Sequence, residues 1–216
     1  MSIAAIVPVK RLSDAKGRLS AVLTPSEREE VTLCMLGGVL RALDHSDAVH
    51  TVYVVTPDDR VAERARERGA IPVRDDGHDL NVALRLATDV AVRDGAHACL
   101  IVFGDLLLLT ANEVAEMVAC AQRANACVIA PARSDTGTNA LYLNSPIVLP
   151  YLFGAESFLR YVETAREHGV PLEIYRSVGT GYDLDRPTDL DEIRDSTEHT
   201  EFRAPLKRAL EAACRE

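Results

Sequence analysis

The sequence has no tryptophan, few aromatic residues (5%) and no excess of positive charge. Its formal net charge of −9 argues against a nucleic-acid-binding protein, which needs a basic face to neutralise phosphates. Long apolar segments are also missing, since runs such as 98–103 and 106–109 are far too short to cross a bilayer. The first ten residues contain no basic region ahead of an apolar stretch. We therefore expect a cytoplasmic protein that binds neither nucleic acid nor membranes.

The cysteines lack the Cys-x-x-Cys spacing that marks zinc and redox sites. The first four of the five lie in apolar surroundings, so we expect reduced and partly buried thiols. The five are Cys34, Cys99, Cys120, Cys127 and Cys214.

With these classes set aside, length and composition describe an ordinary globular chain. The 216 residues are 47% hydrophobic and 26% charged, and a chain of this length buries roughly 70–75% of its unfolded surface. We expect one domain spanning residues 1–216, with a core that needs no disulfide or metal to hold it together.

Segments typical of strands and helices alternate along the chain. The β-branched run Ile3–Val9 predicts a first strand that is buried on both faces. The closely spaced strands between 127 and 143 suggest an antiparallel addition to a parallel sheet. The pattern predicts a three-layer α/β domain with a mixed, mainly parallel sheet. The remaining strands are expected at 51–56, 71–73, 98–103, 127–130, 140–143 and 172–175, and the helices at 24–43, 57–69, 80–93, 111–124, 156–168, 188–195 and 203–214.

A basic loop follows the first strand, at the edge of the sheet where α/β proteins bind ligands. Lys10, Arg11, Lys16 and Arg18 place four cations in nine positions, opposed only by Asp14. The loop has neither the Gly-x-Gly-x-x-Gly dinucleotide fingerprint nor a P-loop. It could be a solvated loop that aids solubility. Its position directly after a buried strand favours the alternative, in which the cations neutralise a triphosphate.

A carboxylate, Asp105, ends the apolar segment 100–104. Burying it without a partner would cost several kcal/mol, and Mg²⁺ that bridges to phosphate oxygens would compensate. Asp105 could instead cap the helix that begins near Ala111, but four leucines separate the two. We therefore favour a metal ligand.

Two further acids, Asp183 and Asp185, are spaced to lie on one face of an extended strand. Like charges this close need a cation or hydrogen-bond donors between them. Together with Asp105 they could form an oxygen-rich Mg²⁺ site. Alternatively, Asp185 caps a helix near Pro187, while Asp189 and Asp191 interact with its dipole.

Two segments could bind a second anionic substrate. The Gly137-Thr138-Asn139 turn offers backbone N–H groups, a hydroxyl and an amide. Gly154–Phe158 opens a helix, where free N–H groups attract anions. Each is weak alone, because turns and helix starts commonly use such residues. As a pair they could hold a phosphate and a carboxylate.

Taken in order, these motifs are similar to those of one family. The chain resembles the 2-phospho-L-lactate / phosphoenolpyruvate guanylyltransferases of coenzyme F(420) biosynthesis, from Val7 to about Ile193. The segments that carry the resemblance are Val7-Pro8-Val9-Lys10-Arg11-Leu12, Ala15-Lys16-x-Arg18-Leu19-Ser20, Leu80-Asn81-x-Ala83-Leu84, Gly104-Asp105-Leu106, Ala130-Pro131, Gly137-Thr138-Asn139, Phe153-Gly154-x-x-Ser157-Phe158 and Asp183-Leu184-Asp185-x-Pro187-x-Asp189-Leu190.

The resemblance implies a Rossmann-like fold of the nucleotide-diphospho-sugar transferase type that uses GTP and Mg²⁺. A phospho-acid would attack the GTP α-phosphorus and release pyrophosphate. The composition, with many Arg and Ala residues and no extreme acidity, is typical of a bacterial protein and favours phosphoenolpyruvate over 2-phospho-L-lactate. A homodimer would be plausible. By position, the implied catalytic residues are Lys16, Arg18 and Asp105, and the implied GTP-binding residues are Lys10, Arg11, Leu80 and Asn81. The implied acceptor-binding residues are Thr138, Asn139, Gly154 and Ser157, and the implied metal ligands are Asp105, Asp183 and Asp185.

Two positions depart from the family pattern. Leu107 stands where relatives usually carry proline. Proline would stiffen the loop that carries Asp105, so the sequence does not fix the path of that loop. Asp79 stands where many relatives carry glycine. Three alternatives remain: 3-phosphoglycerate as the acceptor, a CTP- or UTP-dependent enzyme acting on a sugar phosphate, and a nucleotide-binding regulator without turnover. The retained acids argue against the last.

Overall fold

The computed structural model describes residues 2–133, 136–146 and 148–189. Its strands form one seven-stranded sheet in the order β3-β2-β1-β4-β6-β5-β7. Every neighbouring pair is parallel except for β6, which runs antiparallel to β4 and β5. The predicted mixed, mainly parallel sheet is therefore confirmed. The strands are β1 Ile3–Pro8, β2 Thr51–Thr56, β3 Ile71–Arg74, β4 Ala98–Val102, β5 Cys127–Pro131, β6 Thr138–Leu143 and β7 Leu172–Ile174.

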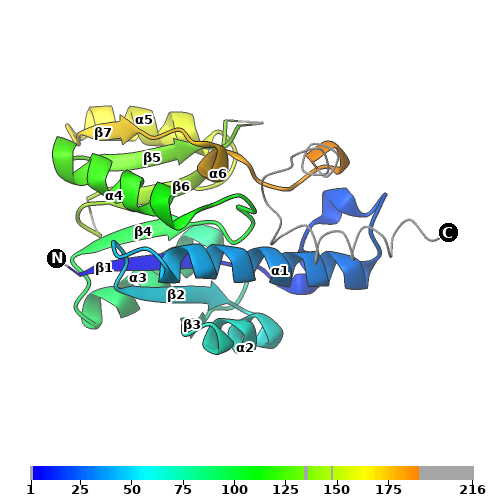
Figure 1. Ribbon diagram of the computed structural model, residues 1–216. Coiled ribbons are helices and arrows are strands. Elements are labelled where there is room, and N and C mark those ends of the chain that lie inside the picture. Colours follow the sequence, from blue (N-terminus) through cyan, green and yellow to red (C-terminus); the bar gives the residue numbers. More distant parts are fainter. Residues whose placement is uncertain (1, 134–135, 147, 190–216) are drawn as a thin grey trace.

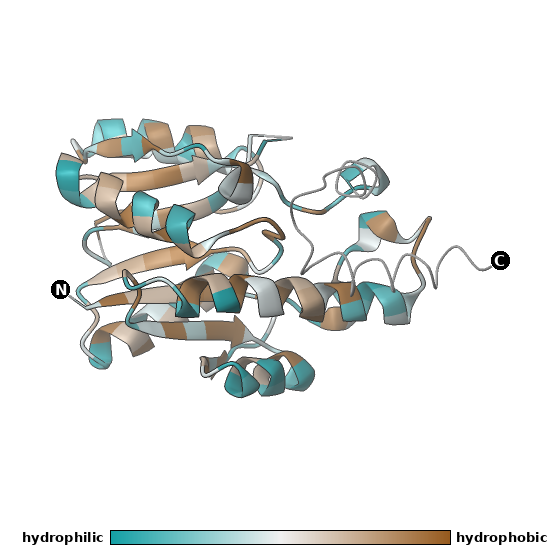
Figure 2. Ribbon diagram, in the orientation of Figure 1, coloured by the Kyte–Doolittle hydropathy of each residue, from teal (hydrophilic) through white to brown (hydrophobic). Residues whose placement is uncertain are grey.

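Helices cover both faces of this sheet, which gives the three layers visible in Figure 1. α1, α2 and α4 pack on one face, and α3 and α5 on the other. Figure 2 shows brown, apolar strands enclosed by helices whose outer sides carry teal, polar residues. The helices are α1 Pro25–Asp44, α2 Asp59–Glu67, α3 Leu80–Arg93, α4 Ala111–Ala124, α5 Ser157–Glu167 and the one-turn α6 Val178–Gly181.

The central strands are buried along their whole length. All six residues of β1 and all five of β4 are buried, because each strand has a neighbour on both sides and helices above and below. This explains why both strands consist of continuous apolar runs instead of alternating apolar and polar residues. Polar groups in this part of the sheet therefore lie in the loops at the strand ends.

The structure differs from the predicted elements near the C-terminal part of the chain. α6 was not predicted. Asp183–Asp185 forms no strand, contrary to expectation, because the segment leaves α6 without pairing to the sheet. The helix expected at 188–195 falls largely, and that at 203–214 entirely, outside the described residues. No helix among residues 2–133, 136–146 and 148–189 has the length and apolar character required to cross a membrane.

Candidate functional site

The predicted site residues gather at the carboxyl-terminal edge of the parallel strands. The loop after β1 and the segment that follows α6 both lie at the end of the sheet to which the β1 and β2 arrows point (Figure 1). Because β6 is antiparallel, it starts at this edge, so its first residues, Thr138 and Asn139, lie here too. Three segments far apart in sequence therefore meet at one edge.

Lys16 lies at the centre of the site. Its Nζ donates to Asp105 Oδ2 at 2.6 Å and to Asp185 Oδ1 at 3.0 Å. The lysine side chain is only 6% exposed. Arg18 reaches the same aspartate from the surface, at 3.3 Å from Asp185 Oδ2. The predicted convergence of the basic loop with two of the three acids is therefore seen directly.

The local backbone explains how these side chains meet. Lys16 has a left-handed conformation (φ 51°), which is uncommon for a residue other than glycine and is typical of functional positions. Buried Ala15 and Leu19 anchor the chain on either side of it. In the loop after β4, a Cβ at Gly104 would lie 3.1 Å from Val9 Cγ2, so the glycine lets the Asp105 loop pass close to the end of β1.

The charges within this cluster stabilise one another. Burial opposes the charge of Lys16, but Asp105 and Asp185 outweigh it and raise the pKa of the lysine above 10.5. Burial alone would likewise raise the pKa of Asp185, but Lys16, Arg18 and Lys10 lower it below 3.8. Lys16 and Asp185 are therefore both held in their charged forms.

Asp183 has the opposite environment. Burial, followed by the negative charge of Asp105, raises its pKa above 3.8, although Asn139 Nδ2 donates to its Oδ1 at 3.3 Å. The same Nδ2 also donates to the Thr180 carbonyl at 3.1 Å. The negative charge of Asp105 close to Asp183 makes a further cation favourable at this place.

Lys16 is already paired with two of the three predicted magnesium ligands, Asp105 and Asp185. In the described part of the chain, no three His, Cys, Asp or Glu side chains form a group that could hold a metal. Asp185 is paired with both Lys16 and Arg18, and Asp105 is paired with Lys16, whereas the Asp183 carboxylate accepts from Asn139 and lies near the negative charge of Asp105. One or two carboxylates are the usual protein contribution to Mg²⁺ that is bound together with substrate phosphates. The three-aspartate site remains a prediction.

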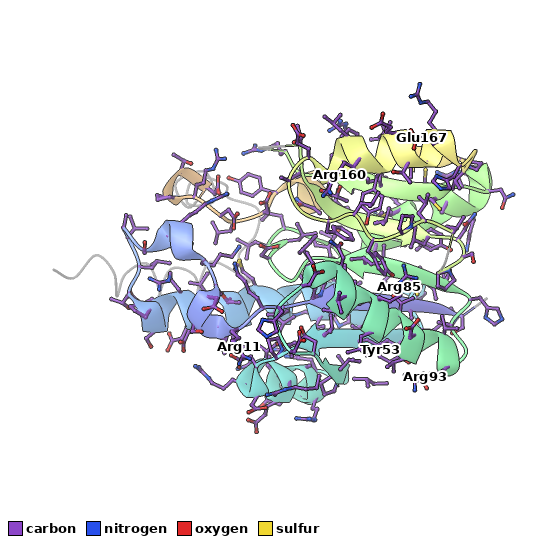
Figure 3. The ribbon with its side chains drawn as sticks, turned by 180° about the vertical axis from the view of Figure 1, so that it is seen from behind. Arg11, Tyr53, Arg85, Arg93, Arg160 and Glu167 are labelled. Carbon is purple, nitrogen blue, oxygen red and sulfur yellow. The ribbon has the colours of Figure 1, made fainter. Side chains whose placement is uncertain are left out.

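The other two predicted cations separate from each other. Lys10 lies close enough to lower the pKa of Asp185. Arg11, labelled in Figure 3, lies instead beside the loop after β3, where its Nε would be 3.6 Å from a Cβ on Gly77. The next residue, Leu12, donates its backbone N–H to Asp58 Oδ2 at 3.0 Å. The basic loop therefore extends from β4 across to β3.

The predicted acceptor residues also come together. Ser157 Oγ donates to Thr138 Oγ1 at 3.2 Å, with both residues buried, and Gly154 lies in the turn before α5 with φ 124°. The expectation that the backbone N–H groups at the start of α5 are free is wrong for two residues. Ser157 N donates to Gly154 O and Phe158 N to Thr136 O, so hydroxyls are the stronger candidates here.

Asn81 has a structural partner that sequence reasoning did not anticipate. Its amide donates to Phe153 O at 3.2 Å and accepts from Phe153 N at 2.9 Å. The start of α3 thereby fixes the segment that leads to Gly154. The preceding Leu80 is half-buried, and Asp79 caps α3 by accepting from the Asn81 and Val82 amides. Contact of Leu80 and Asn81 with GTP remains a prediction.

Sequence reasoning also missed Glu113. Its Oε1 accepts from Gly179 N at 2.8 Å, which fixes α6 against the start of α4. A Cβ at Gly179 would lie 2.1 Å from Glu113 Oε2 and 2.7 Å from Leu108 O, so only glycine fits. The Thr110-x-x-Glu113 capping-box pattern was readable in the sequence, but its contact with α6 was not.

Comparisons with known proteins show the family to which this chain belongs. Residues 3–210 match the family described as guanylyl transferase CofC like. A phosphoenolpyruvate guanylyltransferase from Sphaerobacter thermophilus is 45% identical over 193 residues, covering 89% of this chain and 93% of the relative. A 2-phospho-L-lactate guanylyltransferase from Methanothermobacter thermautotrophicus is 36% identical over 209 residues, covering 96% and 91%.

A solved structure supports the fold independently. The chain superposes with a TM-score of 0.79 on a protein from Desulfovibrio desulfuricans assigned to the nucleotide-diphospho-sugar transferases. The two are 18% identical, and the match covers 99% of this chain and 97% of the other. The expected nucleotidyltransferase fold is confirmed.

Proposed function

Because this chain belongs to the family of CofC-like guanylyl transferases and is a guanylyltransferase, we propose that it transfers GMP from GTP to the phosphate of phosphoenolpyruvate. The observation that best supports this proposal is the Lys16 ammonium held between Asp105 and Asp185, which are 89 and 169 residues away in sequence. The name of the 45%-identical relative supports this acceptor. 2-Phospho-L-lactate, which has the same two anionic groups, is the second candidate because the 36%-identical relative carries its name.

In the reaction, a phosphate oxygen of the acceptor forms a bond to the α-phosphorus of GTP. The bond from that phosphorus to the oxygen bridging to the β-phosphate breaks, and the electron pair leaves with pyrophosphate. The attacking oxygen is already anionic, so no general base is needed. Catalysis then consists of positioning and charge neutralisation.

The residues divide this work by position. Lys16 and Arg18 offset the charge of the triphosphate, and Lys10 and Arg11 extend the same cationic surface along the loop. Mg²⁺, when bound, would supply further neutralisation of phosphate oxygens. Asp105 and Asp183 would hold it once Lys16 moved from the carboxylates to the phosphates, and Asp185 would then join them. Thr138, Asn139, Gly154 and Ser157 would orient the acceptor beside the acids.

The test is pyrophosphate release with Mg²⁺ and a matrix of substrates. GTP, ATP, CTP and UTP are each combined with phosphoenolpyruvate, 2-phospho-L-lactate, 3-phosphoglycerate and a sugar phosphate. We expect release with GTP alone, and fastest with phosphoenolpyruvate. Release with CTP or UTP and the sugar phosphate would contradict the proposal and favour the alternative enzyme.

A pair of variants tests the role of the acids. Asp105→Ala should lower turnover by at least about 10³-fold with the fold retained. Asp14→Asn is the matched control, because this acid lies in the same basic loop but hydrogen-bonds only its neighbour Ser13 in the described structure. An active Asp105→Ala protein would contradict the assignment.

A further inference from the structure

A carboxylate at the far end of the same sheet edge has an unused acceptor. Asp75 directly follows β3, and its Oδ2 accepts from Gly77 N at 2.9 Å. Its other oxygen, Oδ1, is buried and has no hydrogen-bond partner among the described residues. A buried acceptor without a donor destabilises the protein that carries it. Such an atom marks a place where a donor is missing.

The surrounding turn does not supply that donor. The Gly77 amide is used by the other oxygen of Asp75, and the His78 amide donates to Asp76 Oδ1 at 3.1 Å. In the described part of the chain, two other buried side-chain atoms lack partners, on Arg28 and Ser46, but they lie within and just after α1. Asp75 is the one that lies at the end of a strand.

Its position fits the base of a nucleotide whose phosphates lie at Lys16. Strand order places β3 three neighbours away from β4, which is about 14 Å at the usual strand spacing. An extended nucleoside triphosphate covers a distance of this order. Asp75 lies two residues beyond Val73, which packs on the face covered by α3, so its side chain leaves the strand on that face. Leu80 and Asn81 begin the same helix.

We propose that the carboxylate of Asp75 accepts from the N1–H and the N2 amine of guanine and thereby selects GTP. This inference rests on the proposed function and names the residue that fixes the base. Guanine presents two adjacent donors that match the two oxygens of a carboxylate. Adenine and cytosine present a ring-nitrogen acceptor at this edge, and uracil a single N–H between two carbonyls.

Binding requires a local movement, because Oδ1 is covered in the free protein. The turn is held by the side chains of Asp75 and Asp76, each accepting from a backbone amide two residues ahead. Gly77, at φ 79°, packs against Pro57 at a distance that leaves no room for a side chain. The turn shifts as the base enters, and the Asp75 carboxylate then accepts two hydrogen bonds from guanine.

The test is a change of base preference in Asp75→Asn. The carboxamide still accepts from N1–H, but its NH₂ group faces the guanine amine. Xanthosine triphosphate has an oxygen at that place, which the NH₂ group can donate to. We expect kcat/KM for GTP to fall about 100-fold and that for xanthosine triphosphate to rise at least about 10-fold. Inosine triphosphate, which lacks the amine, should be a poor substrate of the unmodified protein.

Asp76→Asn is the matched control, because its side chain is exposed and contacts only His78 N among the described residues. It should leave the ratio of the two substrates unchanged. If Asp75→Asn also leaves that ratio unchanged, Oδ1 is satisfied by water and the proposal is overturned. Calorimetric titration of each variant with each nucleotide gives the same ratio without turnover. Absence of GTP turnover in the unmodified protein would instead contradict the proposed function.

Discussion

The starts of α1 and α4 carry the same motif but differ in what it holds. In α1 the Glu27 carboxylate accepts from the backbone N–H and the hydroxyl of Thr24, both at 2.7 Å. In α4 the Glu113 carboxylate accepts in the same way from Thr110, both at 2.9 Å. Only Glu113 uses its second oxygen for a distant amide, that of Gly179. One capping box therefore only starts a helix, and the other also joins two parts of the site.

The second box connects the two acidic segments. Thr110 ends the loop that begins at Asp105, and α6 leads into Asp183. The Thr180 carbonyl of α6 accepts from Asn139, which also donates to Asp183. We infer that Glu113 is a positioning residue. It touches no predicted substrate, but it sets how the Asp183 segment faces Asp105.

Among the changes that test this contact between α4 and α6, the largest effect is expected for Gly179→Ala. Its Cβ would overlap Glu113 Oε2 and also the Leu108 carbonyl, and the backbone oxygen cannot move away as a side chain can. We expect a loss of about 2–4 kcal/mol in the free energy of unfolding and at least about 100-fold in guanylyl transfer. Gly181→Ala is the control, since its Cβ would be at an ordinary 3.7 Å from Arg133 Cβ. Equal stability and equal turnover in the two variants would contradict the role given to the contact between Glu113 and Gly179.

The next effect comes from comparing Glu113→Ala with Glu27→Ala. Each should cost about 1 kcal/mol of stability through its lost cap. Only Glu113→Ala should lower turnover, by about 10-fold, and raise the Mg²⁺ concentration needed for half-maximal rate, because the two acidic segments are no longer joined. Denaturant unfolding and a Mg²⁺ titration measure both quantities. Parallel losses of activity in the two variants would indicate that the role of Glu113 is only structural.

The smallest effect is expected for Thr110→Ala and Thr24→Ala. Both remove a capping hydroxyl and should cost about 1 kcal/mol each. The bond from Gly179 to Glu113 remains in the first variant, so we expect turnover within about 2-fold of the unmodified protein in both. A large loss confined to Thr110→Ala would show that the cap, and not the contact with α6, carries the positioning.

Much of the fold was readable from local signals. The bounds of α3 and α4 agree with the predicted ranges 80–93 and 111–124, because apolar spacing and the residues at the helix ends indicate the same limits. The strand at 51–56 was bounded equally well. α6 was missed because it is four residues long and contains two glycines, so it carries no periodic signal. The segment 183–185 that follows it is not a strand, because it does not pair with the sheet.

The sequence predicted which residues belong to the candidate site, but it did not predict how they pair with one another. The sequence indicated Lys16, Asp105 and Asp185 from their positions beside strands, and the structure joins them. It could not show that Asp185 pairs with the lysine while Asp183 faces Asn139, because that choice depends on strand order and on the path after α6. The contacts of Asn81 and Glu113 span 72 and 66 residues and leave no local trace.

The most direct test of the account is pyrophosphate release from GTP and phosphoenolpyruvate by Lys16→Met. This change keeps the apolar stem of the side chain and removes only the charge that links the Asp105 and Asp185 loops. We predict a loss of at least about 10³-fold, with circular dichroism showing the fold retained. A folded Lys16→Met protein with a rate within about 3-fold of the unmodified enzyme would contradict the claim that this ammonium forms the centre of the phosphate site.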